Sequence, residues 1–91
     1  MLLEVGRRRI DLGERGNITV VYSVISEYDN EFMCDMFGVS VRIEESGEER
    51  MLAGITSLAD EAFQLASVLI KGKVTPVTLK DVVSDWIARI L

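Results

Sequence analysis

The spacing of the apolar residues changes near residue 56, and this change restricts the chain to a small set of folds. Before that point, β-branched and aromatic residues recur at alternate positions, which is the period of a strand. After it, apolar residues recur at intervals of three and four, which is the period of a helix. We therefore expect an α+β fold, in which three or four antiparallel strands precede two C-terminal helices. The 91 residues have room for one domain, divided into a β-meander over 1–56 and a two-helix segment over 57–91.

Four segments of the first part are predicted as strands. They cover residues 2–12, 17–28, 32–44 and 50–55. The second is the clearest, because it is dense in β-branched and aromatic residues. Asp29-Asn30 and Ser46-Gly47 mark turns, the second as a hairpin tip where glycine supplies a positive φ. The short connections favour an antiparallel meander of sequential neighbours.

Two helices are predicted in the second part. The first is capped by Thr56 or Ser57 and ends near Gly72, the residue type that most often follows a helix. The second begins at Thr78, which forms a capping box with Asp81. One stripe of the second helix is apolar and comprises Leu79, Val82, Val83, Trp86, Ile87 and Ile90. We expect both helices to pack on the same face of the sheet.

The strands contain more apolar residues than a sheet with one solvated face requires. Residues 17–28 are apolar at most even positions, and Val21 and Ile25 extend this character to the odd positions. Two helices cover one face, so the other is expected to make a contact of its own. A second copy is the simplest partner, since two-fold dimers are the commonest assembly. The candidate interface residues are Val21, Ile25, Phe32 and Met36.

Two other arrangements account for the same residues. A twisted or bulged meander that bends at Gly38 would fold over and bury the surplus within one chain. Alternatively, a small ligand would bind between the sheet and the helices. The residues predicted to line that pocket are Tyr22, Phe37 and Trp86.

The chain has no histidine and a single cysteine, Cys34, and these counts narrow its chemistry. Histidine is the usual general acid–base near neutral pH and the commonest metal ligand. A Ser-His-Asp triad or a structural zinc site therefore cannot be built from this chain. Acidic clusters at the two turns lack the spacing of a calcium loop. We expect no catalytic residues, no metal and no cofactor, and a non-enzymatic function in protein interaction or regulation.

The charge is distributed unevenly along the chain. All of the net −5 falls within residues 1–56, whereas residues 57–91 are neutral. An acidic strand region repels phosphate backbones, so we expect no nucleic-acid partner despite the basic run Arg7-Arg8-Arg9. No apolar run is long enough to span a membrane, and the N-terminus lacks the residue order of a signal peptide. With a lone cysteine that suits a reducing compartment, we expect a cytoplasmic protein.

Three short motifs resemble a family of short, uncharacterised proteins found mainly in clostridia and related Firmicutes. They are Phe37-Gly38-Val39-x-Val41 on a strand, Ile55-Thr56 before the first helix, and Thr75-Pro76-Val77-Thr78-Leu79-Lys80-Asp81-Val82-Val83-Ser84-Asp85 at the entry to the last helix. The resemblance covers about residues 32–87. It implies a cytoplasmic bacterial protein of unknown function, and it brings no catalytic residues with it.

Overall fold

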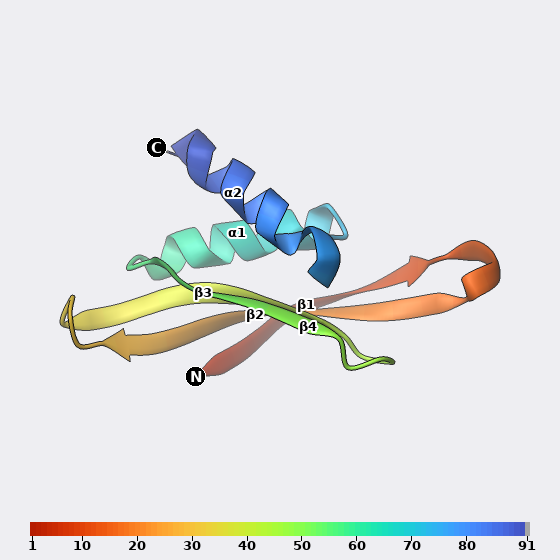
Figure 1. Ribbon diagram of the computed structural model, residues 1–91, viewed down its shortest axis with the longest axis horizontal. Helices are drawn as coiled ribbons and strands as arrows, with labels where there is room; N and C mark the ends of the chain where they lie inside the picture. The colour runs from red at the N-terminus through yellow and green to blue at the C-terminus, as the bar shows by residue number, and fades with distance from the viewer. Residues whose placement is uncertain (91) are drawn as a thin grey trace.

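A computed structural model describes residues 1–90 and contains the expected elements in the expected order (Figure 1). Four strands form one antiparallel sheet in the order β1-β2-β3-β4. The elements are β1 (Leu2–Asp11), β2 (Asn17–Asp29), β3 (Cys34–Ile43), β4 (Glu49–Thr56), α1 (Ala59–Lys71) and α2 (Leu79–Ile90), with short 3-10 turns η1 (Gly13–Arg15) and η2 (Pro76–Thr78). Both helices lie on the same side of the sheet, so the predicted α+β meander with two helices on one face is confirmed.

The core lies between α1 and the middle of the sheet. The antiparallel register places Val24 opposite Val39 and Tyr22 opposite Val41, so these side chains share one face. The helix covers them with the stripe that its sequence period predicts, which consists of Ala62, Leu65, Ala66 and Leu69. The second helix adds buried residues only near its start, at Leu79 and Val83. Fully burying a side chain of this size contributes about 1.5–3 kcal/mol, so this layer dominates the stability of the fold.

Tyr22 joins the sheet to the connection between the helices. Its ring is fully buried, and its hydroxyl donates a hydrogen bond of 2.8 Å to the carbonyl oxygen of Val74. Burial raises the pKa of Tyr22 to about 12, because the low-dielectric surroundings disfavour the phenolate. The phenol therefore keeps its proton, and remains a donor, at neutral pH.

The sheet is longer than the layer of helices that covers it (Figure 1). The molecule measures 48 × 26 × 17 Å. Along β2, the residues from Val20 to Ile25 are buried, whereas both ends of the strand are more exposed. The β1–β2 and β2–β3 hairpins thus extend beyond the helices at opposite ends of the sheet. Neither described helix has the length and apolarity needed to cross a bilayer.

Two predicted boundaries are wrong because local hydrogen bonds were not foreseen. Phe32 was expected in a strand but lies in the turn over 30–33. The Asp29 carboxylate oxygen accepts bonds from the backbone N–H groups of Glu31 and Phe32, which lengthens the turn. The predicted capping box at Thr78 does not form. Its hydroxyl donates to the carbonyl oxygen of Thr75 instead, within the 3-10 turn that leads into α2.

The ends of α1 also differ in detail from the prediction. Thr56, one of the two expected caps, accepts a bond from the Leu58 backbone N–H and donates to the Glu61 carboxylate at 2.5 Å. The helix itself starts later than expected, at Ala59. At the other end, Gly72 keeps a right-handed conformation, and Lys73 is the residue that adopts a positive φ, of 51°.

Candidate functional site

The face of the sheet opposite the helices is partly closed by a bulge in β4. Phe37 pairs with Thr56 and Val39 pairs with Leu52, so three residues of β4 lie opposite the single residue Gly38. A Cβ atom on Gly38 would collide with the carbonyl oxygen of Leu52. The close approach of the two backbones therefore requires glycine at this position. The expected irregularity lies opposite Gly38, in β4, whereas β3 itself keeps a continuous register with β2 through Gly38. The bulge brings the Leu52 backbone close to the Gly38 side of the sheet.

An ion-pair bridge covers the middle of the same face. Arg7 lies directly opposite Val21 in the β1–β2 register. Its guanidinium contacts Glu4 at 2.8 Å and reaches across β2 to Glu44 at 2.5 Å. The hydrogen bond from Arg7 holds the pKa of Glu4 below its usual range, and the two carboxylates together raise the pKa of Arg7. Long charged side chains thus shield Val21 where no helix does.

The predicted interface residues fall into two groups. Val21 and Ile25 are only 3% and 6% exposed, so the single chain already covers them. Met36 is half-buried on β3, whereas Phe32 is 66% exposed, in the turn at the end of the β2–β3 hairpin. The accessible part of the predicted interface therefore lies at the β2–β3 hairpin and not in the middle of the sheet.

The β2–β3 hairpin ends in an exposed apolar cluster of Tyr28, Phe32 and Met33, here called the hairpin tip. Met33 is 73% exposed, and its backbone adopts a positive φ of 56°. That conformation costs a non-glycine residue on the order of 1–2 kcal/mol. The Asp29 carboxylate fixes the turn from inside, through bonds of 2.8 and 3.2 Å to backbone N–H groups. Met33 therefore has a strained backbone conformation, and the ordered turn that contains it exposes these apolar side chains to water.

The hairpin tip is surrounded by negative charge. Residues 27–35 include four carboxylates and no basic residue; the acidic ones are Glu27, Asp29, Glu31 and Asp35. Among residues 1–90, no group of three or more His, Cys, Asp or Glu side chains is placed to hold a metal ion. The carboxylates therefore surround an apolar cluster without forming a chelating centre.

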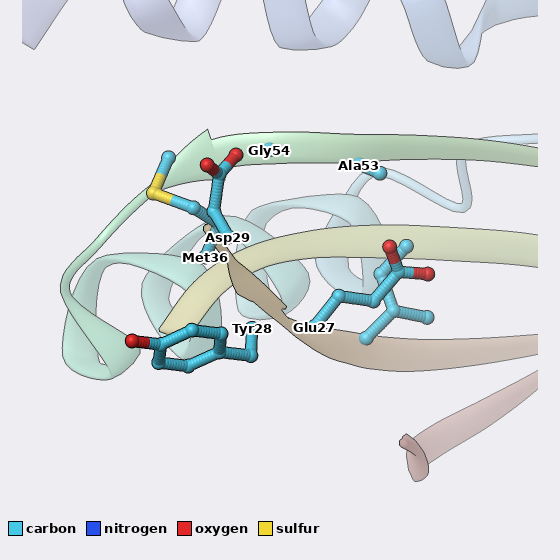
Figure 2. Close-up of a pocket in the computed structure, with 7 residues that line it drawn as sticks. Glu27, Tyr28, Asp29, Met36, Ala53 and Gly54 are labelled. Carbon is cyan, nitrogen blue, oxygen red and sulfur yellow. The ribbon is translucent and has the colours of Figure 1, made fainter. Parts of the chain in front are cut away.

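A cavity of about 210 Å³ lies beneath the β4 bulge, next to the hairpin tip (Figure 2). It is lined by Ile25, Glu27, Tyr28, Asp29, Met36, Ala53 and Gly54. In Figure 2 the Asp29 carboxylate lies on the Met36 and Gly54 side, while the Tyr28 ring points away from them. Small-molecule sites typically begin at about 300 Å³. The cavity has room for a few water molecules or a very small polar ligand.

The residues predicted to line a pocket between sheet and helices are instead parts of the packed core. Tyr22 is fully buried, and its hydroxyl is already bonded to Val74. Phe37 and Trp86 are half-buried and pack against the same core. Any ligand in contact with all three would have to displace core side chains, which costs several kcal/mol.

A second concavity, of about 240 Å³, lies between β4 and the start of α2, and we call it the Val77 groove. It is lined by Arg50, Met51, Leu52, Pro76, Val77, Leu79 and Lys80. Val77 is 78% exposed, which is unusual for a β-branched apolar residue. Sequence reasoning missed this groove, because it treated Pro76–Thr78 only as a helix entry. The signal in the sequence was Val77 itself, an apolar residue in the connection between the helices that does not belong to the apolar stripe of α2.

Comparison with known proteins identifies a family for this chain. No curated protein and no solved structure matches the sequence. The model of one protein family, DUF6514, matches residues 1–89, which extends well beyond the segment covered by the resemblance seen in the sequence. The chain therefore belongs to DUF6514, a family of unknown function.

Proposed function

We propose that this protein is a self-associating interaction module, without catalytic activity of its own, whose contact is made by the hairpin tip. The observation that carries the proposal is the pair Phe32 and Met33, both exposed by more than half on a turn that hydrogen bonds hold in place. Exposed apolar clusters of this kind on a folded protein usually mark a contact surface.

The energetics favour such a contact. Burying a Phe or Met side chain contributes roughly 1.5–3 kcal/mol, and aromatic anchors dominate many interfaces. The turn is already ordered by Asp29 and needs little further ordering on association. Preorganisation of this kind strengthens binding, because less entropy is lost when the complex forms.

A second copy of the chain is the partner we propose. The hairpin extends beyond the helices, so another molecule can reach it without rearrangement of the core (Figure 1). Two-fold dimers are the commonest assembly, and they use each interface residue twice. We place the protein in the bacterial cytoplasm, as the resemblance of its motifs implies and as its one free cysteine, Cys34, favours.

The test is the mass in solution of the wild type and of the double variant Phe32→Ser/Met33→Ser. We expect the wild type to have twice the chain mass at tens of micromolar, and the variant to dissociate with a Kd weaker by roughly 10- to 100-fold or more. Leu12→Ser is the matched control, because Leu12 is an exposed apolar residue next to the turn at the other end of the sheet. A monomeric wild type, or a variant as dimeric as the control, would overturn the proposal.

The cavity beneath the β4 bulge supports binding of a small ligand as a second candidate function. Its small volume and its two carboxylates, Glu27 and Asp29, favour a small cationic compound. The test is to titrate a panel of small amines and follow the NMR signals of the Ala53 and Gly54 amides. We expect saturable shifts for at least one amine if this function operates, and a flat response across the panel would exclude it.

A further inference from the structure

The Val77 groove has the shape and the charge to receive the hairpin tip. We propose that the hairpin tip of one copy inserts into the Val77 groove of a second copy, and that the second copy does the same in return. This inference rests on the proposed function and specifies the surface that the tip contacts.

The size of the groove matches an aromatic anchor. An apolar cavity of about 150 Å³ is large enough to bind benzene. At about 240 Å³, the groove has room for the ring of Phe32 and part of a neighbouring side chain. Its apolar lining includes Pro76 and Val77, and Val77, which is 78% exposed in the single chain, would be covered by the insertion.

The charges of the two surfaces are complementary. The segment 27–35 at the tip has four carboxylates and no basic residue. The residues that line the groove include two basic ones, Arg50 and Lys80, and no acidic one. Glu49 adjoins the groove in sequence, but its carboxylate accepts a hydrogen bond from Ser40 on the opposite face of the sheet. Complementary potentials of this kind select the partner and fix its register.

The tip cannot fill the groove of its own chain. In Figure 1 the β2–β3 turn lies at one end of the sheet, whereas the start of α2 lies above the opposite half. Each copy therefore presents one tip and one groove to other molecules. Mutual insertion fills both grooves and buries both tips, so the assembly closes at two copies. One-way insertion would leave a free tip and a free groove and would continue into a filament.

The decisive experiment reverses the charges on each surface and then mixes the two variants. The tip variant is Glu27→Lys/Glu31→Lys/Asp35→Lys, which changes the charge of segment 27–35 from −4 to +2. The groove variant is Arg50→Glu/Lys80→Glu, which changes the charge of the groove lining from +2 to −2. In either homodimer, like charges face each other at both contacts. In the mixed dimer, each basic tip meets an acidic groove and each acidic tip meets a basic groove. Lys71→Glu/Lys73→Glu is the matched control for the groove variant, because it makes the same charge change on two exposed residues outside the groove lining.

We expect each variant alone to dimerise with a Kd weaker by roughly tenfold or more at low salt, and the equimolar mixture to recover the wild-type mass. The control should dimerise like the wild type. Dissociation of the tip variant while the groove variant stays dimeric would overturn this inference and leave the proposed function standing. So would a mixture that stays monomeric. A monomeric wild type would overturn both this inference and the proposed function. A mass that rises beyond two copies with concentration would overturn mutual insertion.

Cross-linking provides a second measurement that does not depend on charge. In a Cys34→Ser background, chains with Met33→Cys are mixed with chains with Val77→Cys under mild oxidation. We expect a disulfide-linked species that contains one chain of each kind. Leu12→Cys in place of Met33→Cys serves as the control and should give little of it. Equal yields from Met33→Cys and Leu12→Cys would contradict the insertion.

Discussion

The two faces of β2 are buried to a similar extent by different physical means. Tyr22 and Val24 lie beneath α1, in a layer of close-packed apolar side chains. Val21 and Ile25 point the other way and are covered by a backbone bulge and by a bridge of charged side chains. Burial of the first face depends on the volume of the packed side chains. Burial of the second face depends on backbone geometry and on the ionisation of charged side chains, so the two faces should respond to different perturbations.

The largest effect is expected beneath α1. Leu65→Ala leaves a cavity in the core, because Leu65 has no exposed surface. Such truncations cost about 2–5 kcal/mol, which for a domain of this size lowers Tm by on the order of 10–20 °C. Thermal unfolding followed by circular dichroism measures the change. Phe63→Ala, on the exposed side of the same helix, is the control and should cost less than about 1 kcal/mol.

The next effect is expected on the opposite face. Gly38→Ala places a methyl group against the carbonyl oxygen of Leu52, so β4 must move away. We expect a loss of about 1–3 kcal/mol, measured by urea unfolding. Gly6→Ala is a useful comparison, because its methyl group would meet only the flexible end of the Ile70 side chain. Equal losses for the two variants would contradict a backbone cause at Gly38.

A smaller effect is expected from the hydroxyl of Tyr22. Tyr22→Phe keeps the packing of the ring but leaves the Val74 carbonyl without its 2.8 Å donor. The expected cost is about 1–2 kcal/mol, from the lost bond and the unsatisfied acceptor. The variant should also exchange the amide protons of the α1–α2 connection faster than the wild type. Unchanged exchange in that connection would show that the bond does not anchor it.

The smallest effect is expected from the charged bridge, and it depends on pH. The hydrogen bond from Arg7 lowers the pKa of Glu4 from its ordinary value of 4.5, and the backbone N–H of Thr19 does the same for Glu45. A lowered folded-state pKa stabilises the fold fully above the unfolded value. That stabilisation is lost as the pH falls below about 4.5 and through the lowered values. The free energy of unfolding measured against pH should show this loss.

Glu4→Gln provides the control for the acid response. The variant removes the titrating group of the bridge, so its free energy of unfolding should fall less between neutral pH and the acid range. Glu14→Gln, in the connection between β1 and β2, carries the same charge change outside the bridge. If Glu4→Gln and Glu14→Gln have the same acid slope, the bridge does not contribute to the stability of the open face.

Most of the fold could be predicted from the periodicity of the sequence, because burial of one face imposes that periodicity directly. The strand-then-helix order and the α1 stripe around Leu65 are examples. Details that depend on single hydrogen bonds were missed. The hydroxyl of Thr78 bonds backward to Thr75, and Lys73, not Gly72, takes the left-handed conformation after α1. Both are short-range choices between competing hydrogen bonds, which residue-type preferences alone do not decide.

The candidate site was predictable in part. Phe32 is an accessible residue of the predicted interface, whereas Val21 and Ile25 are shielded by parts of the chain that are distant in sequence. Gly38 was identified as a bend, but its opposing three-residue bulge in β4 depends on register, which the sequence does not specify. The Val77 groove combines β4 with the start of α2, so it exists only once the chain has folded.

The overhang of the sheet beyond its helices has a consequence for motion. The two central strands, β2 and β3, are buried over their middle and more exposed towards their ends. Hydrogen exchange should therefore be graded along β2 and β3, with the slowest exchange at the middle of each strand. The two hairpin ends can open and close repeatedly while the centre stays intact. Local fluctuations at the β2–β3 end would then set how often a partner is released, without any unfolding of the domain.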